Sequence, residues 1–509
     1  MSGAQITLLV TLMTLSWWAF NPREEPLRGR KLLTHPKRPS TEGRISWGGS
    51  VVPRKAETTH FSVIGAPGSG KTLTLKQMMR EALPDIDSLP DQRAFVYDAK
   101  QDALGFLSSL PLDCPIVTLN PFDARSAAWD MAKDITTPSA AEQLARIIVP
   151  DEQGGGNYFF SAGARDLLTE LVTTFMRTAP GEWTLRDLVL AGSNKDSLHD
   201  VLSCTVSGQA MLASYFSEER TGMNVLATLR TRLAPLDVAA SLWAKADYKV
   251  SLEEWANGNF VLVVASDERI RASLDTLNRV IFRRLVDITL SQPESFERRS
   301  WYFLDEVRDG GKLDGLSSLM TRGRSKGVSV VLGFQDVNGL RHAYGHDLAN
   351  EIMAMCSNVA LLRMASSETA AWASKLMGDY ERVEVRLSTS TNGTRRSKTK
   401  SEDRRKTEAV LPSEFLTLPL TNAANGLPGF YMSPELGAYR TTTPLADILG
   451  NEQGTEPDFI PRPDQDQWLE RWSESDFERL GITATAPIDP DLIRPRIHDE
   501  RESDLSLSR

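Results

Sequence analysis

The chain has 509 residues, of which 41% are hydrophobic and 25% are charged, and its formal net charge is -9. This balance is that of a globular protein and excludes a disordered or fibrous chain, and the length exceeds that of one simple domain. Three widely spaced cysteines, Cys114, Cys204 and Cys356, form no C-x-x-C pair, so the sequence indicates neither a disulfide framework nor a zinc ribbon.

The N-terminal region contains an uncharged run from Ile6 to Phe20, with the aromatic pair Trp17 and Trp18 near its end. Such a pair is typical of a membrane interface, although the run is shorter than the ~20 residues that a spanning helix needs. A signal peptide is disfavoured because no basic residue precedes the run. The next segment is rich in Arg and Lys, so the positive-inside rule places the bulk of the chain in the cytoplasm. We predict a membrane anchor over residues 1–22 and a basic connector over residues 23–43; a buried or processed segment is the alternative.

Short apolar runs then alternate with helical patterns, which is the order typical of a parallel sheet covered by helices. We expect strands at Phe61–Ile64, Ala94–Tyr97, Ile116–Leu119, Phe260–Ala265, Trp301–Leu304, Val328–Phe334 and Val359–Leu362. The pattern predicts a doubly wound α/β core, with a nucleotide-binding domain divided between residues 44–150 and 256–447.

The region between the third and fourth predicted strands is about 140 residues long, far more than a βαβ crossover requires. Its apolar residues recur at helical spacing, as in Ala164, Leu167, Leu168, Leu171, Val172 and Phe175. We therefore predict an inserted all-α domain over residues 151–255. Long crossover helices without the identity of a domain are the alternative.

Two further segments differ in composition. Residues 388–408 are polar and carry Arg395, Arg396, Lys398, Lys400, Arg404, Arg405 and Lys406, which predicts a mobile basic loop, either merely solvated or in contact with DNA phosphates or lipid. Residues 448–509 are acidic and contain prolines, which predicts a C-terminal tail. Such a tail either solubilises the chain or captures a basic partner.

The strongest motif is GAPGSGKT, which follows a predicted strand and opens a predicted helix. It comprises Gly65, Ala66, Pro67, Gly68, Ser69, Gly70, Lys71 and Thr72. In such a loop the glycines let backbone N–H groups turn toward phosphates, and the helix N-terminus adds a partial positive charge. We expect Lys71 to bridge the β- and γ-phosphates of ATP and Thr72 to ligate Mg²⁺.

A second acidic motif is needed for hydrolysis, and WYFLDE supplies two carboxylates at the end of an apolar strand. Asp305 is expected to hold Mg²⁺ through its second coordination shell, and Glu306 to polarise the attacking water. Gln335 follows the next predicted strand, where its amide would sense the γ-phosphate or orient water. Between these strands, TRGRSKG offers basic residues, one of which could serve as an arginine finger for a neighbouring subunit.

The sequence resembles a known family. RISWGGSVVP, HFSVIGAPGSGKT, VYDAKQD, LNPFDARSAAWD, LLRMASSETAAWASKLMG and the long stretch FLDEVRDGGKLDGLSSLMTRGRSKGVSVVLGFQDVNGLRHAYG are similar to motifs of the type IV secretion system coupling proteins, the VirD4, TraD and TrwB family of conjugation. The similarity covers roughly residues 44 to 440, and the long stretch is far more specific than the phosphate loop.

The resemblance implies a membrane-anchored hexameric ATPase at the bacterial inner membrane, with a RecA-like core and an inserted all-α domain in the cytoplasm. It implies recruitment of relaxase and relaxosome proteins with single-stranded DNA, or of protein substrates, for delivery to the type IV secretion channel. It makes Asp305 and Glu306 the Walker B pair, Gln335 the sensor and Arg324 the trans-acting arginine finger.

Two departures from the family pattern stand out. Gln101 follows Lys100 where the family usually has Gly, so we assign the segment from Asp98 to Lys100 no role beyond packing beside the nucleotide. Members usually begin with two membrane helices, and at most one is visible here. Two other functions stay open: a double-stranded DNA translocase of the FtsK or HerA type, and a substrate receptor that uses nucleotide only as an assembly switch.

Overall fold

The computed structural model describes residues 28–37, 43–151, 157–267, 270–306, 311–392, 395–449, 454, 456–463 and 468–483. The predicted anchor over residues 1–22 and the last residues of the predicted tail lie outside this range. Within the range, no helix combines the length and the apolar character that crossing a bilayer requires.

The chain forms two compact units, between which it passes more than once. The first comprises Met1–Leu83, Phe303–Arg308 and Ser329–Glu452, and the second Pro84–Tyr302, Asp309–Val328 and Gln453–Arg509. Strand β10 (Arg299–Leu304) carries the chain from the second unit into the first.

The first unit is built on strands in the order β16, β15, β12, β4, β11, all largely buried except the edge strand β16. In chain order these are β4 (Phe61–Ile64), β11 (Val328–Phe334), β12 (Asn358–Leu361), β15 (Leu427–Ser433) and β16 (Gly437–Thr443). Strand β4 pairs in parallel with β11 and β12, and Ile64 lies level with Phe334 and Leu361. Their carboxyl ends therefore meet at one edge, where open α/β sheets bind ligands.

Helices of the first unit follow these strands, as the apolar periodicity predicts. They are α2 (Lys71–Ala82), α16 (Val337–Tyr344), α17 (His346–Met355), α18 (Ser367–Met377), α19 (Pro412–Thr417) and α20 (Leu445–Leu449), with the 3-10 helix η1 (Arg54–Thr59). A small hairpin of β2 (Ser46–Trp47) and β3 (Ser50–Val51) precedes them. The buried Trp47 packs edge-on against Phe61 and Tyr431, which fixes this hairpin on the core.

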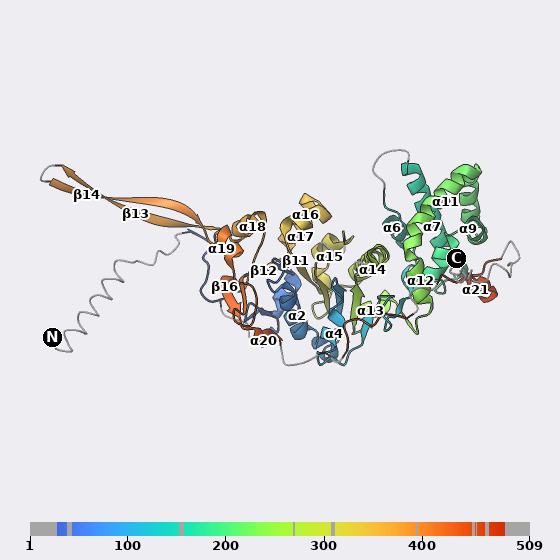
Figure 1. Cartoon of the computed structure of the whole chain (residues 1–509), viewed down its shortest axis with the longest axis horizontal. Coiled ribbons are helices and arrows are strands. Elements are labelled where there is room, and N and C mark those ends of the chain that lie inside the picture. Colours follow the sequence, from blue (N-terminus) through green and yellow to red (C-terminus); the bar gives the residue numbers. More distant parts are fainter. Residues whose placement is uncertain are drawn as a thin grey trace, which may run out of the picture. The chain divides into compact units, whose positions relative to one another are not determined.

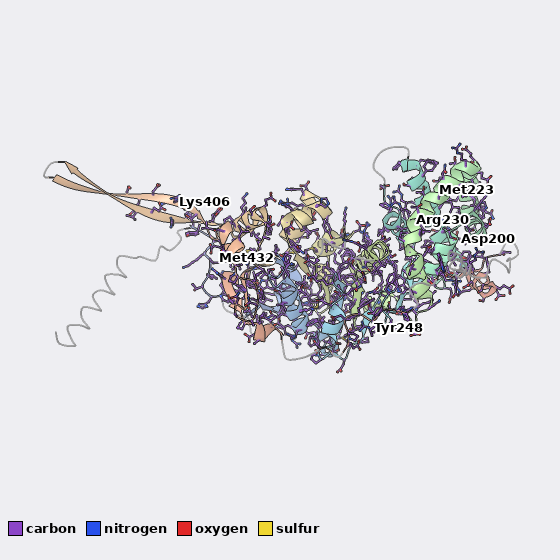
Figure 2. All side chains as sticks on the ribbon, viewed as in Figure 1. Asp200, Met223, Arg230, Tyr248, Lys406 and Met432 are labelled. Carbon is purple, nitrogen blue, oxygen red and sulfur yellow. The ribbon has the colours of Figure 1, made fainter. Side chains whose placement is uncertain are left out.

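The predicted basic loop at residues 388–408 is instead part of a long two-stranded ribbon (Figure 1). Strands β13 (Asp379–Asn392) and β14 (Arg395–Glu408) pair along their whole length, and β1 (Arg28–Gly29) pairs with β13. The loop prediction was wrong because the polar composition obscured a hairpin signal: a glycine next to Asn392, after a stretch that contains Val and Thr. Lys406, which is labelled in Figure 2, lies on this ribbon, and its Nζ is 2.7 Å from Asp379 Oδ2.

The second unit contains β5 (Gln92–Asp98), β9 (Val261–Ala265) and β6 (Ile116–Thr118), which pair in parallel in that order. A short parallel pair joins β7 (Ala128–Trp129) to β8 (Lys249–Val250). All seven strands expected from the apolar runs are therefore present, with ends that differ by at most two residues.

Helices dominate the rest of the second unit, and those between residues 157 and 257 confirm the helical character predicted there. The helices are α3 (Asp85–Ser88), α4 (Ala103–Leu107), α5 (Met131–Asp134), α6 (Pro138–Ile148), α7 (Asn157–Thr178), α8 (Leu185–Ala191), α9 (Lys195–Leu202), α10 (Val206–Tyr215), α11 (Glu219–Leu233), η2 (Ala234–Leu236), α12 (Asp237–Ala244), α13 (Leu252–Asn257), α14 (Arg271–Ser291), α15 (Leu316–Arg322), η4 (Arg324–Lys326) and α21 (Glu474–Leu480). Helix α7 packs against α9 and α11 (Figure 1). The apolar series from Ala164 to Phe175 is fully buried there.

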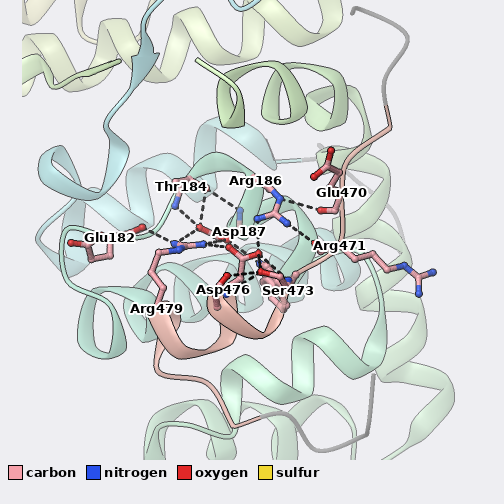
Figure 3. A network of polar contacts seen from close by, with 11 residues as sticks. Glu182, Thr184, Arg186, Asp187, Glu470, Arg471, Ser473, Asp476 and Arg479 are labelled. Carbon is pink, nitrogen blue, oxygen red and sulfur yellow. Dashed lines mark hydrogen bonds and ion pairs between the residues drawn. The ribbon is translucent and has the colours of Figure 1, made fainter. Parts of the chain in front are cut away.

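Part of the predicted acidic tail is folded onto this unit rather than free. Asp187 on α8, which is completely buried, accepts hydrogen bonds from both terminal nitrogens of Arg479 (Figure 3). It also accepts one from Trp472 Nε1 at 2.9 Å. Asp476 receives a further bond from Arg186 at 3.1 Å. A buried carboxylate needs such partners, so residues 468–483 belong to the fold, and the tail prediction was wrong for them.

Candidate functional site

The loop between β4 and α2 adopts a backbone that its glycines make possible. Gly68 and Gly70 have φ of 73° and 98°, in the left-handed region that side chains disfavour. Gly70 is the N-cap of α2 and offers no side-chain acceptor to the first turn. The helix therefore begins with backbone donors and a positive dipole end that favour an anion.

The start of the same loop is tightly packed. A Cβ on Gly65 would lie 2.4 Å from Ser69 Oγ, so a larger residue does not fit. The Ala66 N–H donates to Arg363 O at 2.8 Å, which ties the loop to the end of β12. The Ser69 hydroxyl is buried and has no hydrogen-bond partner among the described residues. A buried hydroxyl in that condition is costly unless a ligand satisfies it.

Lys71 is buried at the first position of α2. Its Nζ donates to Gly65 O at 2.9 Å and lies 3.3 Å from Glu306 Oε1, and each of the two charged side chains is 5% exposed. The ammonium is thus held inside the concave face of the loop, where the low dielectric strengthens its interaction with anions.

Thr72 and Asp305 meet directly, because the Thr72 hydroxyl donates to Asp305 Oδ2 at 2.9 Å. The other carboxylate oxygen, Oδ1, accepts the Glu306 N–H at 3.0 Å. Gly333 on β11 makes room for this carboxylate, since a Cβ there would lie 2.7 Å from Asp305 Oδ1. A hydroxyl and a carboxylate in contact are hard oxygen ligands of the kind that Mg²⁺ prefers.

Glu306 is held in an unusual backbone conformation. Its φ of 51° lies in the left-handed region, which is uncommon for a residue other than glycine and concentrates at functional sites. The Gln335 Nε2 donates to Glu306 Oε1 at 3.2 Å. Glu306 is therefore fixed between the ammonium of Lys71 and the amide of Gln335.

Most of the site residues predicted from the sequence are thus brought together within the first unit. The predicted finger, Arg324, belongs to the second unit, where it lies exposed in η4. Pro67 is exposed on the phosphate loop. Sequence reasoning missed a segment of the first unit, from Leu418 to Gly426, that packs against this loop. No local motif marks it.

The segment from Asp98 to Gln101 has a structural function in the second unit. The Asp98 carboxylate accepts the N–H groups of Lys100, Asp102 and Ala103, which shapes the turn into α4. Burial raises the pKa of Asp98 to about 6. Gln101 has φ of 56°, in the left-handed region that glycine adopts more readily than glutamine does.

The residues present fit a nucleoside triphosphate with Mg²⁺. The loop supplies a helix N-terminus without a side-chain cap, a buried ammonium, and a buried Ser69 hydroxyl that no described residue hydrogen-bonds. Thr72 and Asp305 supply paired oxygen ligands next to them. Together these groups match the charge of a phosphate chain and of a hard divalent cation.

The chain is similar to known proteins over most of its length. Residues 44–431 match the family model of the type IV secretion-system coupling protein DNA-binding domain. The coupling protein TraD of Escherichia coli strain K12 is 22% identical over 488 residues, which cover 90% of this chain and 64% of TraD. The chain therefore spans less than two thirds of that relative.

Solved structures of the bacterial conjugative coupling protein TrwB share the fold. The unbound form of TrwB superimposes with a TM-score of 0.68 at 22% sequence identity, covering 87% of this chain and 97% of that chain. The form in complex with ADP and Mg²⁺ gives a TM-score of 0.66 at 21% identity, over 87% and 99% of the two chains. The fold is accordingly that of an α/β coupling protein.

Proposed function

Because the chain belongs to the family of type IV secretion-system coupling proteins, we propose that it is an ATPase that couples ATP hydrolysis to the delivery of relaxase-bound DNA or protein to a secretion channel. The observation that carries this proposal is the contact of Lys71 with Glu306 beside that of Thr72 with Asp305, at the carboxyl ends of the strands. The complex of TrwB with ADP and Mg²⁺ supports the same ligand here.

In the proposed reaction, Lys71 and the N–H groups at the start of α2 hold the β- and γ-phosphates. Thr72 and Asp305 would hold Mg²⁺, which neutralises charge on the phosphate oxygens. Glu306 orients a water molecule, whose oxygen forms a bond to the γ-phosphorus while the bond to the bridging oxygen breaks. The Glu306 carboxylate accepts the proton of that water.

Gln335 has a distinct role in this scheme. Its amide donates to Glu306, so it keeps the carboxylate oriented and reports whether the γ-phosphate is present. Arg324 is exposed and has no ion-pair partner among the described residues, which suits a finger that completes the site of a neighbouring subunit. This arrangement requires a homo-oligomer, and we propose a hexamer.

The remaining parts of the proposal concern location and partners. Residues 1–22 would anchor the chain in the bacterial inner membrane, with the bulk in the cytoplasm. The helices between residues 157 and 257 would form the inserted domain that meets single-stranded DNA, relaxosome proteins or channel components. Support comes from the family match, whose model describes a DNA-binding domain.

A direct test measures ATP hydrolysis by the full chain in detergent, with and without single-stranded DNA. Hydrolysis should rise with single-stranded DNA and with protein concentration, because subunits complete one another's sites. Thr417→Val, which removes a hydroxyl bonded within α19, serves as a control substitution outside the phosphate loop. If the rate of ATP hydrolysis did not change with single-stranded DNA and rose only with duplex DNA, the result would indicate a duplex translocase and reject the proposal.

A further inference from the structure

The loop between α19 and β15 contacts the phosphate loop from outside, and Thr421 makes the closest polar contact. Its hydroxyl donates to Ser69 O at 2.7 Å, and its N–H approaches Gly68 O at 3.4 Å. These two carbonyls belong to residues at least 352 positions before Thr421 in the sequence. Both belong to the stretch whose N–H groups must face a phosphate.

A planar trans peptide links each carbonyl to the N–H of the next residue, which points in the opposite direction. No cis peptide bond occurs among the described residues. Holding the Ser69 carbonyl toward Thr421 therefore directs the Gly70 N–H away from Thr421. Without an external donor, that carbonyl could rotate inward, where it would repel an anion and leave the amide misdirected.

The loop that carries Thr421 is itself rigid. Asn422 Oδ1 accepts the N–H groups of Ala424 at 3.0 Å and of Asn425 at 2.8 Å, and Asn422 O accepts the Gly426 N–H at 2.8 Å. The Asn425 side chain donates back to Leu420 O at 2.9 Å. Such a self-bonded turn presents Thr421 in one position.

Packing shows how closely the two loops fit. A Cβ on Gly70 would lie 2.2 Å from Leu427 Cδ1 and 2.9 Å from Thr421 Oγ1. A Cβ on Gly68 would lie 3.6 Å from Leu420 Cδ2. Gly68 and Gly70 of the phosphate loop thus both lie against the segment from Leu420 to Leu427.

We propose that Thr421 is a positioning residue for nucleotide binding: its hydroxyl fixes the Ser69 carbonyl outward, so that the Gly70 N–H faces the phosphates. The inference rests on the proposed ATPase function. It assigns to the segment from Leu418 to Gly426 the task of keeping the phosphate loop in its binding conformation.

The test compares Thr421→Val, Thr421→Ser and Thr417→Val in the full chain. Thr417→Val is the matched control because its hydroxyl bonds only within α19, to Ser413 O at 2.8 Å and Glu414 O at 3.4 Å. One readout is the Kd for ATP with Mg²⁺, together with KM and kcat. The other is hydrogen exchange, without nucleotide, of a peptide spanning residues 65–72.

We expect Thr421→Val to weaken ATP binding and raise KM about tenfold, the effect of one lost hydrogen bond. Its kcat at saturating ATP should change less than twofold, since Glu306 is untouched, and exchange of the loop should accelerate. Thr421→Ser should restore the wild-type values. If Thr421→Val and Thr417→Val had equal Kd, equal KM and equal hydrogen exchange of the loop, the positioning role of Thr421 would be overturned and the proposed ATPase function would not. A wild-type chain that binds no ATP would overturn the proposed function as well.

Discussion

The buried ion pair between Lys71 and Glu306 makes a quantitative prediction about stability. Both side chains are 5% exposed and their charged atoms are 3.3 Å apart. Lys71→Met would leave the Glu306 carboxylate buried without its cation, and breaking a buried pair in this way costs about 3 to 5 kcal/mol. That loss is a large part of the roughly 5 to 15 kcal/mol that stabilises a typical domain.

A double-mutant cycle isolates the pair. Glu306→Gln should also destabilise the chain, because the buried Lys71 ammonium loses its counter-charge and keeps only neutral oxygens nearby, such as the Gly65 carbonyl at 2.9 Å. The variant with both substitutions should be more stable than Lys71→Met, since neither residue then carries an unpaired charge. The coupling free energy should be about 2 kcal/mol or more.

The assay is urea unfolding without nucleotide, read by hydrogen exchange of peptides from residues 61–82. This local probe is needed because a chain with two compact units need not unfold in one step. Strictly additive effects of the two substitutions would refute the argument. They would mean that the pair contributes nothing beyond its separate members.

Further predictions concern other sites. Arg324→Ala should lower ATP turnover by about 10³-fold while leaving the Kd for ATP unchanged. Mixing Arg324→Ala subunits with Lys71→Met subunits should partly restore turnover. Retained turnover by Arg324→Ala alone would reject the role of Arg324 as an arginine finger for a neighbouring subunit. Burial raises the pKa of Glu81 from 4.5 to about 7, so the folded chain binds a proton that the unfolded chain lacks, and stability falls as pH rises from about 4.5 to 7. Glu81→Gln should remove that slope and stabilise the chain by about 3 kcal/mol above pH 7, as urea unfolding at several pH values would show. Gln101→Gly should stabilise the second unit by about 0.5 to 1 kcal/mol, because φ of 56° suits glycine; an unchanged or lower melting temperature would contradict this.

The parts of the fold that the sequence predicts well are those with local causes. The strand before Gly65 and the strand before Asp305 consist mostly of apolar residues, and both are buried along their whole length. The phosphate loop follows from its glycines, and the geometry around Lys71 follows from the register that places Ile64 level with Phe334.

The parts that were missed depend on partners far away in the chain. Thr421 contacts Ser69 across 352 positions, and Arg479 contacts Asp187 across 292. Neither residue has a local sequence feature that indicates its partner. The ribbon of β13 and β14 was missed for a different reason: its pairing is local, but its polar, charged composition is typical of a loop.

The measurement that tests the central claim most directly compares ATP binding and ATP hydrolysis for Glu306→Gln and the wild-type chain. The carboxylate shares the Lys71 ammonium, so removing its charge relieves repulsion of a phosphate at the same place. The account predicts a Kd for ATP no weaker than that of the wild type, with hydrolysis at least 10²-fold slower. Hydrolysis at the wild-type rate, or a chain that binds no ATP in either form, would contradict it.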